Sequence, residues 1–205
     1  MRGKFITLEG CDGVGKSTQI ELLKSTLTSR NIDFVFTREP GGTEISESIR
    51  SIITNPHFTA MDSYTELLLY AASRRQHTVE FIKKQLSLGK LVFCDRYSDS
   101  TLAYQGYGRG IDKEAIEFCN KIALGDLKID LTLLFDLPPE DAFKRKGGAD
   151  KNDRLECESF DFYQRVYAGY KEIARLDRVA TIDARGTIYE IHDRVVDALI
   201  ERGIL

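Results

Sequence analysis

The sequence predicts an α/β protein, a three-layer α/β/α fold whose five-stranded parallel sheet is flanked by helices. Three observations lead to this class. Short β-rich runs alternate with helix-patterned segments along the whole chain, and a glycine-rich loop joins the first run to the first helix. The run 91–94 is continuously apolar, as in a central strand covered on both faces. With 205 residues, 42% of them hydrophobic, we expect a single domain over 1–205.

The expected strands lie at residues 4–9, 33–37, 91–94, 131–136 and 179–183. The first helix follows the glycine loop, and a second starts near Thr43 and is stopped by Pro56. Apolar residues at helical spacing predict a long helix over 62–88, with Gly89 as its C-terminal cap. Further helices are expected over 98–106, 112–124, from about 139, over 156–175, and along an apolar face that begins at Ile188.

Bulk composition limits the classes of partner. The net charge is −3, so we expect no nucleic-acid partner. No apolar run approaches the roughly 20 residues of a membrane helix, and the expected first strand leaves no room for a signal peptide. The four cysteines are far apart and form no C-x-x-C pair. These features predict a cytoplasmic protein with reduced thiols and no membrane association.

The stretch 10–17, Gly-Cys-Asp-Gly-Val-Gly-Lys-Ser, matches the phosphate-binding P-loop pattern G-x-x-x-x-G-K-[ST]. Glycines let backbone N–H groups converge on phosphate oxygens, and the following helix adds its positive N-terminal end. Lys16 can reach the β- and γ-phosphates and Ser17 can bind Mg²⁺. The alternative is a glycine-rich turn that binds nothing. The expected ATP-binding residues here are Gly10, Cys11, Asp12, Gly13, Val14, Gly15, Lys16, Ser17 and Thr18.

Charged residues also collect where the other strands end. Arg38 and Glu39 follow the second expected strand, and Asp95 and Arg96 follow the third. In parallel α/β sheets ligands bind beyond the carboxyl ends of the strands. Arginine grips phosphate with two donors, and carboxylates can hold Mg²⁺, so this edge fits phosphoryl transfer to a phosphorylated acceptor. Solvated strand ends or structural ion pairs are the alternative.

Four further segments carry a resemblance to a known family. Residues 37–43 (TREPGGT), 74–77 (RRQH), 95–97 (DRY) and 103–110 (AYQGYGRG) resemble the signatures of bacterial thymidylate kinases, which are P-loop nucleoside-monophosphate kinases. Together with the P-loop, the resemblance covers the chain end to end. It implies transfer of the γ-phosphoryl group of ATP to thymidine monophosphate (dTMP), giving dTDP and ADP for dTTP synthesis. It also implies Mg²⁺ as cofactor and a homodimer.

The resemblance implies a role for individual residues of the acceptor site. Tyr70 would stack on thymine and Arg74 would hydrogen-bond its O4, while Tyr104 would lie beside the deoxyribose and disfavour a 2′-OH. The full set of expected dTMP-binding residues is Asp12, Arg38, Tyr70, Arg74, Arg96, Thr101, Tyr104 and Gln105. The expected catalytic residues are Lys16, Arg96, Asp12 and Glu39, and the expected Mg²⁺ ligands are Ser17, Asp95 and Glu39.

The charged segment at about 144–155 resembles the lid of this family. Arg145 matches the position whose guanidinium stacks on adenine. The family supplies a catalytic arginine from the P-loop or from the middle of the lid, but this chain has no basic residue at 11–14 or at 147–149. Lys146, Lys151 or Arg154 would have to substitute for it. A solvated charged connector is the alternative interpretation of this segment.

Three other functions are alternatives to a thymidylate kinase. A regulatory GTPase would carry N-K-x-D, but Asn120 and Lys121 are followed by Ile122 and Ala123. A kinase for another small acceptor, such as a different nucleotide or a nucleoside, is a nearer alternative; Arg38 and Arg96 favour a phosphorylated acceptor, and Tyr70 with Arg74 favours a planar base. A non-catalytic nucleotide-binding module would have no use for the acceptor-side residues.

Overall fold

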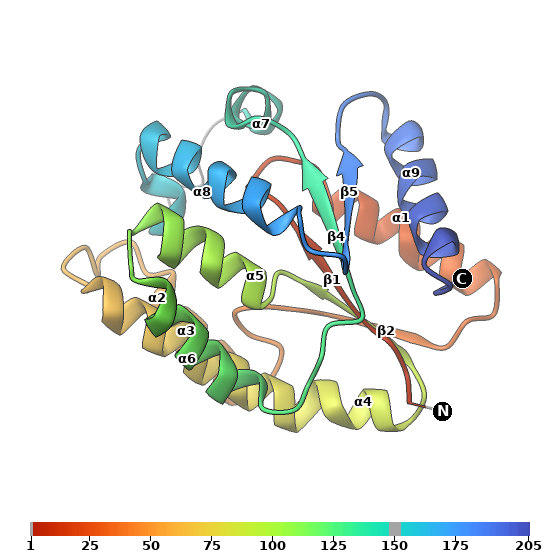
Figure 1. The fold of residues 1–205 in the computed structure, drawn as a ribbon, viewed down its shortest axis with the longest axis horizontal. Helices are drawn as coiled ribbons and strands as arrows, with labels where there is room; N and C mark the ends of the chain where they lie inside the picture. The colour runs from red at the N-terminus through yellow and green to blue at the C-terminus, as the bar shows by residue number, and fades with distance from the viewer. Residues whose placement is uncertain (1, 148–152) are drawn as a thin grey trace.

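A computed structural model describes residues 2–147 and 153–205 and contains one five-stranded sheet (Figure 1). Its strands are β1 (Phe5–Glu9), β2 (Phe34–Arg38), β3 (Leu91–Asp95), β4 (Leu131–Asp136) and β5 (Val179–Asp183). They are all parallel and lie in the order β2-β3-β1-β4-β5. Every expected strand is present, and the predicted α/β class is confirmed.

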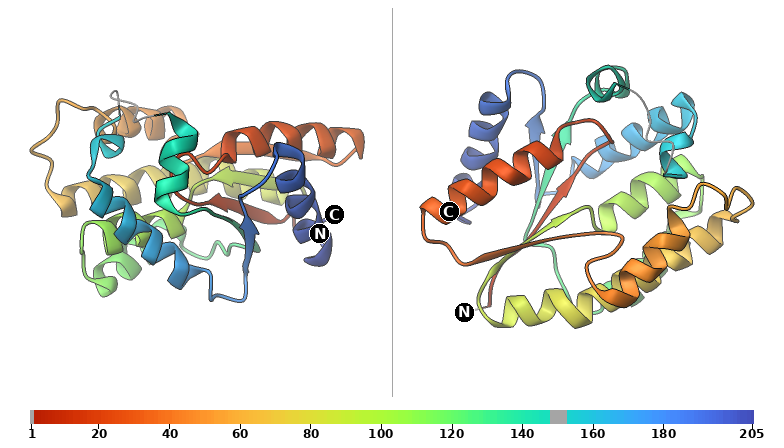
Figure 2. Two further views of the ribbon diagram at one scale, coloured as in Figure 1. Left: turned by 90° about the horizontal axis from the view of Figure 1, so that it is seen from above. Right: turned by 180° about the vertical axis from the view of Figure 1, so that it is seen from behind.

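The helices form a layer on each face of this sheet. Helices α1 (Lys16–Ser29) and α9 (Ile188–Glu201) lie side by side on one face, and α8 (Phe160–Ile173) lies on the other (Figures 1 and 2). Successive side chains of β1 point to opposite faces. Leu8 therefore joins a core with Leu23 of α1, whereas the Phe5 ring packs edge-on against Tyr97, with ring centroids 4.9 Å apart.

The helices that line the site also follow the sequence pattern. Helix α2 (Glu44–Ile53) begins at Thr43, whose hydroxyl accepts a hydrogen bond from the Ser46 N–H. The predicted long helix is continuous from Ser63 to Ser87: α3 (Ser63–His77) passes through a π-helical turn (Thr78–Ile82) into α4 (Lys83–Ser87). Helix α5 (Ser98–Thr101) likewise continues as a π-helical turn, η2 (Leu102–Gly108), and α6 (Lys113–Leu124) follows.

Two boundaries differ from the prediction. Helix α7 (Pro139–Lys146) includes the first part of the expected lid and ends at Gly147, where φ is 74°. The helix expected over 156–175 is instead a 3₁₀ turn (Leu155–Cys157) followed by α8, with Ser159 as its N-cap. The middle of the lid, including Lys151, lies outside the described residues. In the parts of the chain that are described, no helix is long and apolar enough to cross a membrane.

Candidate active site

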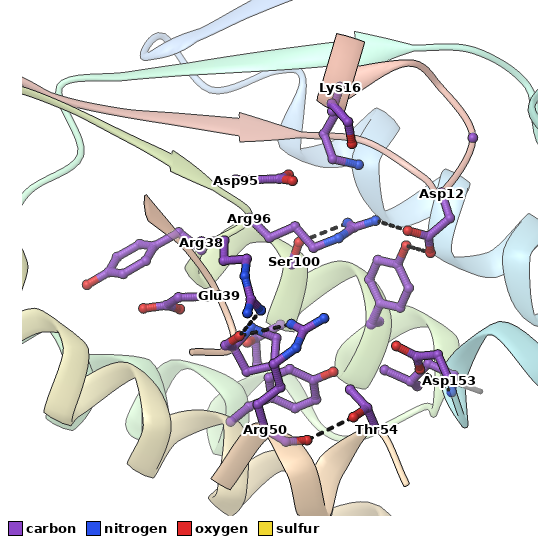
Figure 3. Close-up of a pocket in the computed structure, with 18 of the residues that line it drawn as sticks. Asp12, Lys16, Arg38, Glu39, Arg50, Thr54, Asp95, Arg96, Ser100 and Asp153 are labelled. Carbon is purple, nitrogen blue, oxygen red and sulfur yellow. Dashed lines mark hydrogen bonds and ion pairs between the residues drawn. The ribbon is translucent and has the colours of Figure 1, made fainter. Parts of the chain in front are cut away.

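The carboxyl ends of β1, β2 and β3 open into one cavity of about 500 Å³ (Figure 3). The P-loop, α3, η2 and α7 complete its wall. The sequence-predicted residues that line it are Asp12, Gly13, Gly15, Lys16, Ser17, Thr18, Arg38, Glu39, Tyr70, Arg74, Asp95, Arg96, Thr101, Tyr104, Gln105 and Arg145. Gly10, Cys11 and Val14 do not line it, and their carbonyl oxygens instead accept hydrogen bonds from cations of the site.

The P-loop wraps around the amine of Lys16. Lys16 Nζ donates to the carbonyl oxygens of Gly10 at 3.1 Å and of Cys11 at 3.2 Å. Burial, followed by the neighbouring Arg96 guanidinium, lowers the pKa of Lys16. Gly13 has φ 85°, and a Cβ there would lie 2.5 Å from the Ala142 carbonyl oxygen, so the loop needs glycine at this position. The loop therefore holds a cation where phosphate oxygens bind in P-loop proteins.

Arg96 and Asp12 form an ion pair on the same side of the cavity. Arg96 NH2 lies 2.6 Å from Asp12 Oδ1, and the Tyr104 hydroxyl donates to Asp12 Oδ2 at 3.0 Å. The Arg96 guanidinium also lies 5.0 Å from the centre of the Tyr104 ring. Burial alone would raise the pKa of Asp12, but Arg96 and Lys16 hold that pKa well below its usual range. Asp12 is therefore ionised, and it links the Arg96 guanidinium to the Tyr104 hydroxyl.

Glu9 is a buried carboxylate that is linked to Arg96 through two hydroxyl groups. It was not among the predicted site residues. Glu9 Oε2 accepts hydrogen bonds from the hydroxyls of Ser100 at 2.6 Å and Tyr170 at 2.9 Å. These two hydroxyl oxygens accept from Arg96 NH1 at 3.2 and 3.1 Å. Burial and then the nearby Asp99 carboxylate raise the pKa of Glu9 to about 7. The signal in the sequence was a charged residue at the end of a mostly apolar strand, β1.

Glu39 is held by two partners inside the protein. Its Oε2 lies 2.7 Å from Arg74 Nε and its Oε1 lies 2.9 Å from His77 Nδ1. His77 Nε2 in turn bonds to Thr37 Oγ1 at 2.7 Å. Both carboxylate oxygens are therefore engaged by protein groups. This arrangement differs from the expected role of Glu39 as a Mg²⁺ ligand, and it makes Glu39 the residue that orients Arg74.

The residues expected around the thymine base do come together. Arg74 is 2% exposed, and its NH1 donates to Thr101 Oγ1 at 2.8 Å and to Asn120 Oδ1 at 3.0 Å. Tyr70 and Gln105 line the same cavity. This wall combines an aromatic ring, a fixed guanidinium and an amide, which are groups suited to a planar heterocycle with donors and acceptors on its edge.

Two arginines on the β2–α2 side face the cavity, one of them not predicted. Arg38 NH2 lies 3.0 Å from Glu47 Oε2, and Arg38 NH1 donates to the Pro40 carbonyl oxygen at 3.3 Å. Arg50 NH1 donates to the same oxygen at 2.9 Å. Figure 3 shows Arg50 across the cavity from Lys16. The signal for Arg50 in the sequence was its spacing. It lies three residues before Ile53, which is on the buried face of α2.

Two oxygens in the cavity fit a Mg²⁺ ion. Asp95 Oδ1 is buried and has no hydrogen-bond partner among residues 2–147 and 153–205. Ser17, at the start of α1, is exposed and lines the same cavity. Within these described ranges, no group of three or more acidic, histidine or cysteine side chains is arranged to hold a metal ion. Mg²⁺ commonly binds through one or two protein oxygens together with water and substrate phosphates, so Ser17 and Asp95 suit it and Glu39 does not.

The basic residues that could replace the family's catalytic arginine lie in different places. Arg145 NH1 donates to the Val14 carbonyl oxygen at 3.2 Å, and Lys146 also lines the cavity. Arg154 is bound elsewhere, with its NH2 2.5 Å from Glu66 Oε2 and its Nε donating to the Ile53 carbonyl oxygen. Lys151 lies outside the described residues. Of the two candidates that lie within the described residues, Lys146 lines the cavity and Arg154 does not.

Comparisons with known proteins agree with this geometry. The sequence profile of the family described as thymidylate kinase matches residues 8–195. The chain is 44% identical to a thymidylate kinase of Bacillus licheniformis over 98% of its own length and 97% of the relative. It is 47% identical to a thymidylate kinase of Carboxydothermus hydrogenoformans over 93% of this chain and 94% of the relative. It is also 46% identical to a thymidylate kinase of Ligilactobacillus salivarius, covering 96% and 95% of the two chains. The chain therefore belongs to the thymidylate kinase family.

Proposed function

We propose that the protein transfers the γ-phosphoryl group of ATP to dTMP, giving ADP and dTDP for the synthesis of dTTP. One observation carries this proposal: a single cavity joins the P-loop amine of Lys16 to the wall that contains Tyr70 and the buried guanidinium of Arg74. Phosphoryl transfer requires little beyond positioning two phosphates and neutralising their charge. The relatives named thymidylate kinase support dTMP as the acceptor.

The donor half of the site is built on the P-loop. Residues 10–18 would bind the ATP phosphates with their backbone N–H groups, and Lys16 would leave its carbonyl partners to reach the β- and γ-phosphates. Arg145, on α7, would stack on adenine. Mg²⁺, held by Ser17 and Asp95, would neutralise phosphate charge. Lys146 is our candidate for the cation that the lid supplies.

The acceptor half is built on β2, β3 and α3. Arg96 and Arg38 would hold the dTMP phosphate, with Asp12 near the sugar 3′-OH and Tyr104 beside the deoxyribose. Arg74 would donate to the thymine O4, with Thr101 and Gln105 on the edge of the base and Tyr70 on its face. Because the acceptor phosphate is already anionic, no strong general base is needed. Glu39 acts here by orienting Arg74, with which it forms a buried ion pair.

A homodimer in the cytoplasm completes the proposal. Helices α3 and α6 pack against each other around Leu67, Ile111 and Ile116. Their outer faces expose large apolar side chains, namely Tyr64, Leu68, Phe118 and Ile122. Exposed apolar surface of this kind marks interaction sites in soluble proteins. The four cysteines are free thiols, as a reducing compartment would keep them.

The proposal is tested by the stoichiometry of the reaction. The protein is incubated with ATP, Mg²⁺ and dTMP, and the nucleotides are separated and quantified. ADP and dTDP are expected to appear in equal amounts. ADP formed without dTDP would identify an ATPase and would refute the proposal.

A further inference from the structure

Glu66, on α3, is a buried carboxylate with no direct part in the chemistry described above. It is 1% exposed. Its Oε1 accepts from Gln105 Nε2 at 2.8 Å and from Arg109 Nε at 3.2 Å. Its Oε2 accepts from Arg109 NH2 at 3.0 Å and from Arg154 NH2 at 2.5 Å. One of these four donors, the amide of Gln105, belongs to a residue that lines the nucleotide cavity.

The charge on Glu66 determines which end of that amide faces it. Burial alone would raise the pKa of Glu66, but hydrogen bonds from Arg109 and Gln105 hold that pKa below its ordinary value. An ionised carboxylate only accepts hydrogen bonds, so the group of Gln105 that faces it must be the NH₂. The carbonyl oxygen, Oε1, must then point the other way. Without such a partner, the two ends of a glutamine amide have nearly the same shape and can exchange by rotation.

The amide orientation decides what the cavity offers a base. No residue within 2–147 or 153–205 donates a hydrogen bond to Gln105 Oε1, so this acceptor is available to a ligand. Arg74, across the same wall, offers only donors. A pyrimidine that matches this pair carries an N–H donor at N3 and a carbonyl acceptor at O4, as thymine and uracil do. Cytosine has the opposite pattern, with an acceptor at N3 and an amino donor at C4.

We propose that Glu66 is a specificity-determining positioning residue, which fixes the amide of Gln105 so that the site accepts thymine-type bases and rejects cytosine. Glu66 acts through Gln105 and does not itself touch the nucleotide. This inference rests on the proposed function, because it takes a pyrimidine nucleoside monophosphate as the acceptor.

The test compares kcat/KM for dTMP, dUMP and dCMP between the wild type and Glu66→Gln. A glutamine at 66 can donate as well as accept, so Gln105 can rotate and offer its NH₂ to the N3 acceptor of cytosine. The dTMP-to-dCMP ratio should fall by roughly tenfold or more. The dTMP-to-dUMP ratio should stay unchanged, because these two bases have the same hydrogen-bonding edge and differ only in the 5-methyl group. Loss of both preferences together, or of neither, would overturn the inference.

Glu158→Gln is the matched control. Glu158 Oε1 lies 2.5 Å from Arg109 NH1, so this variant removes a carboxylate from the same arginine without touching Gln105. Both ratios should remain at their wild-type values. If Glu66→Gln does not fold, Glu66→Asp keeps the negative charge between the two arginines but shortens the side chain that reaches Gln105, and the same fall in the dTMP-to-dCMP ratio is expected. A wild-type enzyme that does not prefer dTMP to dCMP would refute the proposed function itself, whereas a selective wild type with unchanged variants would refute only the role of Glu66.

Discussion

Glu39 and Arg74 form an ion pair that solvent does not reach: Oε2 and Nε are 2.7 Å apart, and each side chain is 2% exposed. The pair joins the end of β2 to α3, so the arginine expected to read the base is fixed before any nucleotide binds. Glu39 would therefore contribute to acceptor binding by holding Arg74, instead of binding the metal ion. The difference between these two roles is measurable.

Replacing Glu39 with glutamine should weaken acceptor binding specifically. The change leaves the buried Arg74 charge without its partner, so we expect a loss of about 3–5 kcal/mol in the free energy of unfolding. The KM for dTMP should rise while the KM for ATP stays near its wild-type value. Steady-state kinetics and chemical denaturation measure the two effects. As a control, Glu172→Gln removes an exposed partner of Arg175 and should change neither. A raised Mg²⁺ requirement with an unchanged KM for dTMP would restore Glu39 as a metal ligand.

Replacing Lys16 with methionine should reduce turnover. Because the amine would neutralise charge on the transferring phosphoryl group, we expect kcat to fall roughly 100- to 1,000-fold. The affinity for dTMP, measured by calorimetry, should be retained. Lys24→Met is the control on the same helix, since Lys24 is paired with Glu21 on the exposed side of α1. A Lys16→Met enzyme with the kcat of the wild type would contradict the proposed donor site.

The raised pKa of Glu9 predicts a pH-dependent stability. Folding raises this pKa from its ordinary value of 4.5 to about 7. The stabilising contribution is thus complete below pH 4.5 and is lost as the pH rises through about 7. Asp12, with its lowered pKa, acts in the opposite direction and only in more acidic solution.

The measurement is the melting temperature between pH 5 and pH 8 for the wild type and Glu9→Gln. In the wild type this one group should lower the free energy of unfolding by at most about 1.4 kcal/mol per pH unit in this window. Glu9→Gln should show a shallower decline. Parallel curves for the two proteins would show that Glu9 does not titrate there.

A charge on the outer face of α6 should prevent dimerisation. Phe118 and Ile122, four residues apart on α6, are 65% and 56% exposed, and Leu68 of α3 is 60% exposed. Phe118→Glu should give a monomer in sedimentation experiments, because a carboxylate is costly to bury in an apolar interface. Tyr189→Glu, at an aromatic of α9 that is 72% exposed, should leave the assembly unchanged. If the two variants sediment alike, the proposed α3–α6 interface is wrong.

Much of the fold could be predicted because its signals are local. Each strand is a short apolar or β-rich run, and the P-loop has a fixed pattern between a strand and a helix. The start of the expected lid was misassigned because its charges and glycines are typical of a loop. In the structure, Pro139 at the first turn and the basic residues of the last turn complement the ends of α7 and extend it to Lys146.

The supporting residues could not be predicted because their partners come from distant parts of the chain. Glu9 binds the Tyr170 hydroxyl 161 positions away, and Glu66 binds Arg154 88 positions away. A single sequence, considered without an alignment, shows that such carboxylates exist but does not show which cation or hydroxyl they will contact. For the same reason, the sequence did not show whether Glu39 would be a metal ligand or the ion-pair partner of Arg74, which lies 35 positions away.

The identity of the preferred acceptor is the direct test of dTMP phosphorylation. Initial rates with saturating ATP and Mg²⁺ should be measured across dTMP, dUMP, dCMP, dAMP and dGMP. We expect the highest kcat/KM for dTMP, because Arg74 and Gln105 would match its O4 and N3–H and Tyr70 would stack on its ring. A cytosine or purine nucleotide as the best acceptor would contradict it.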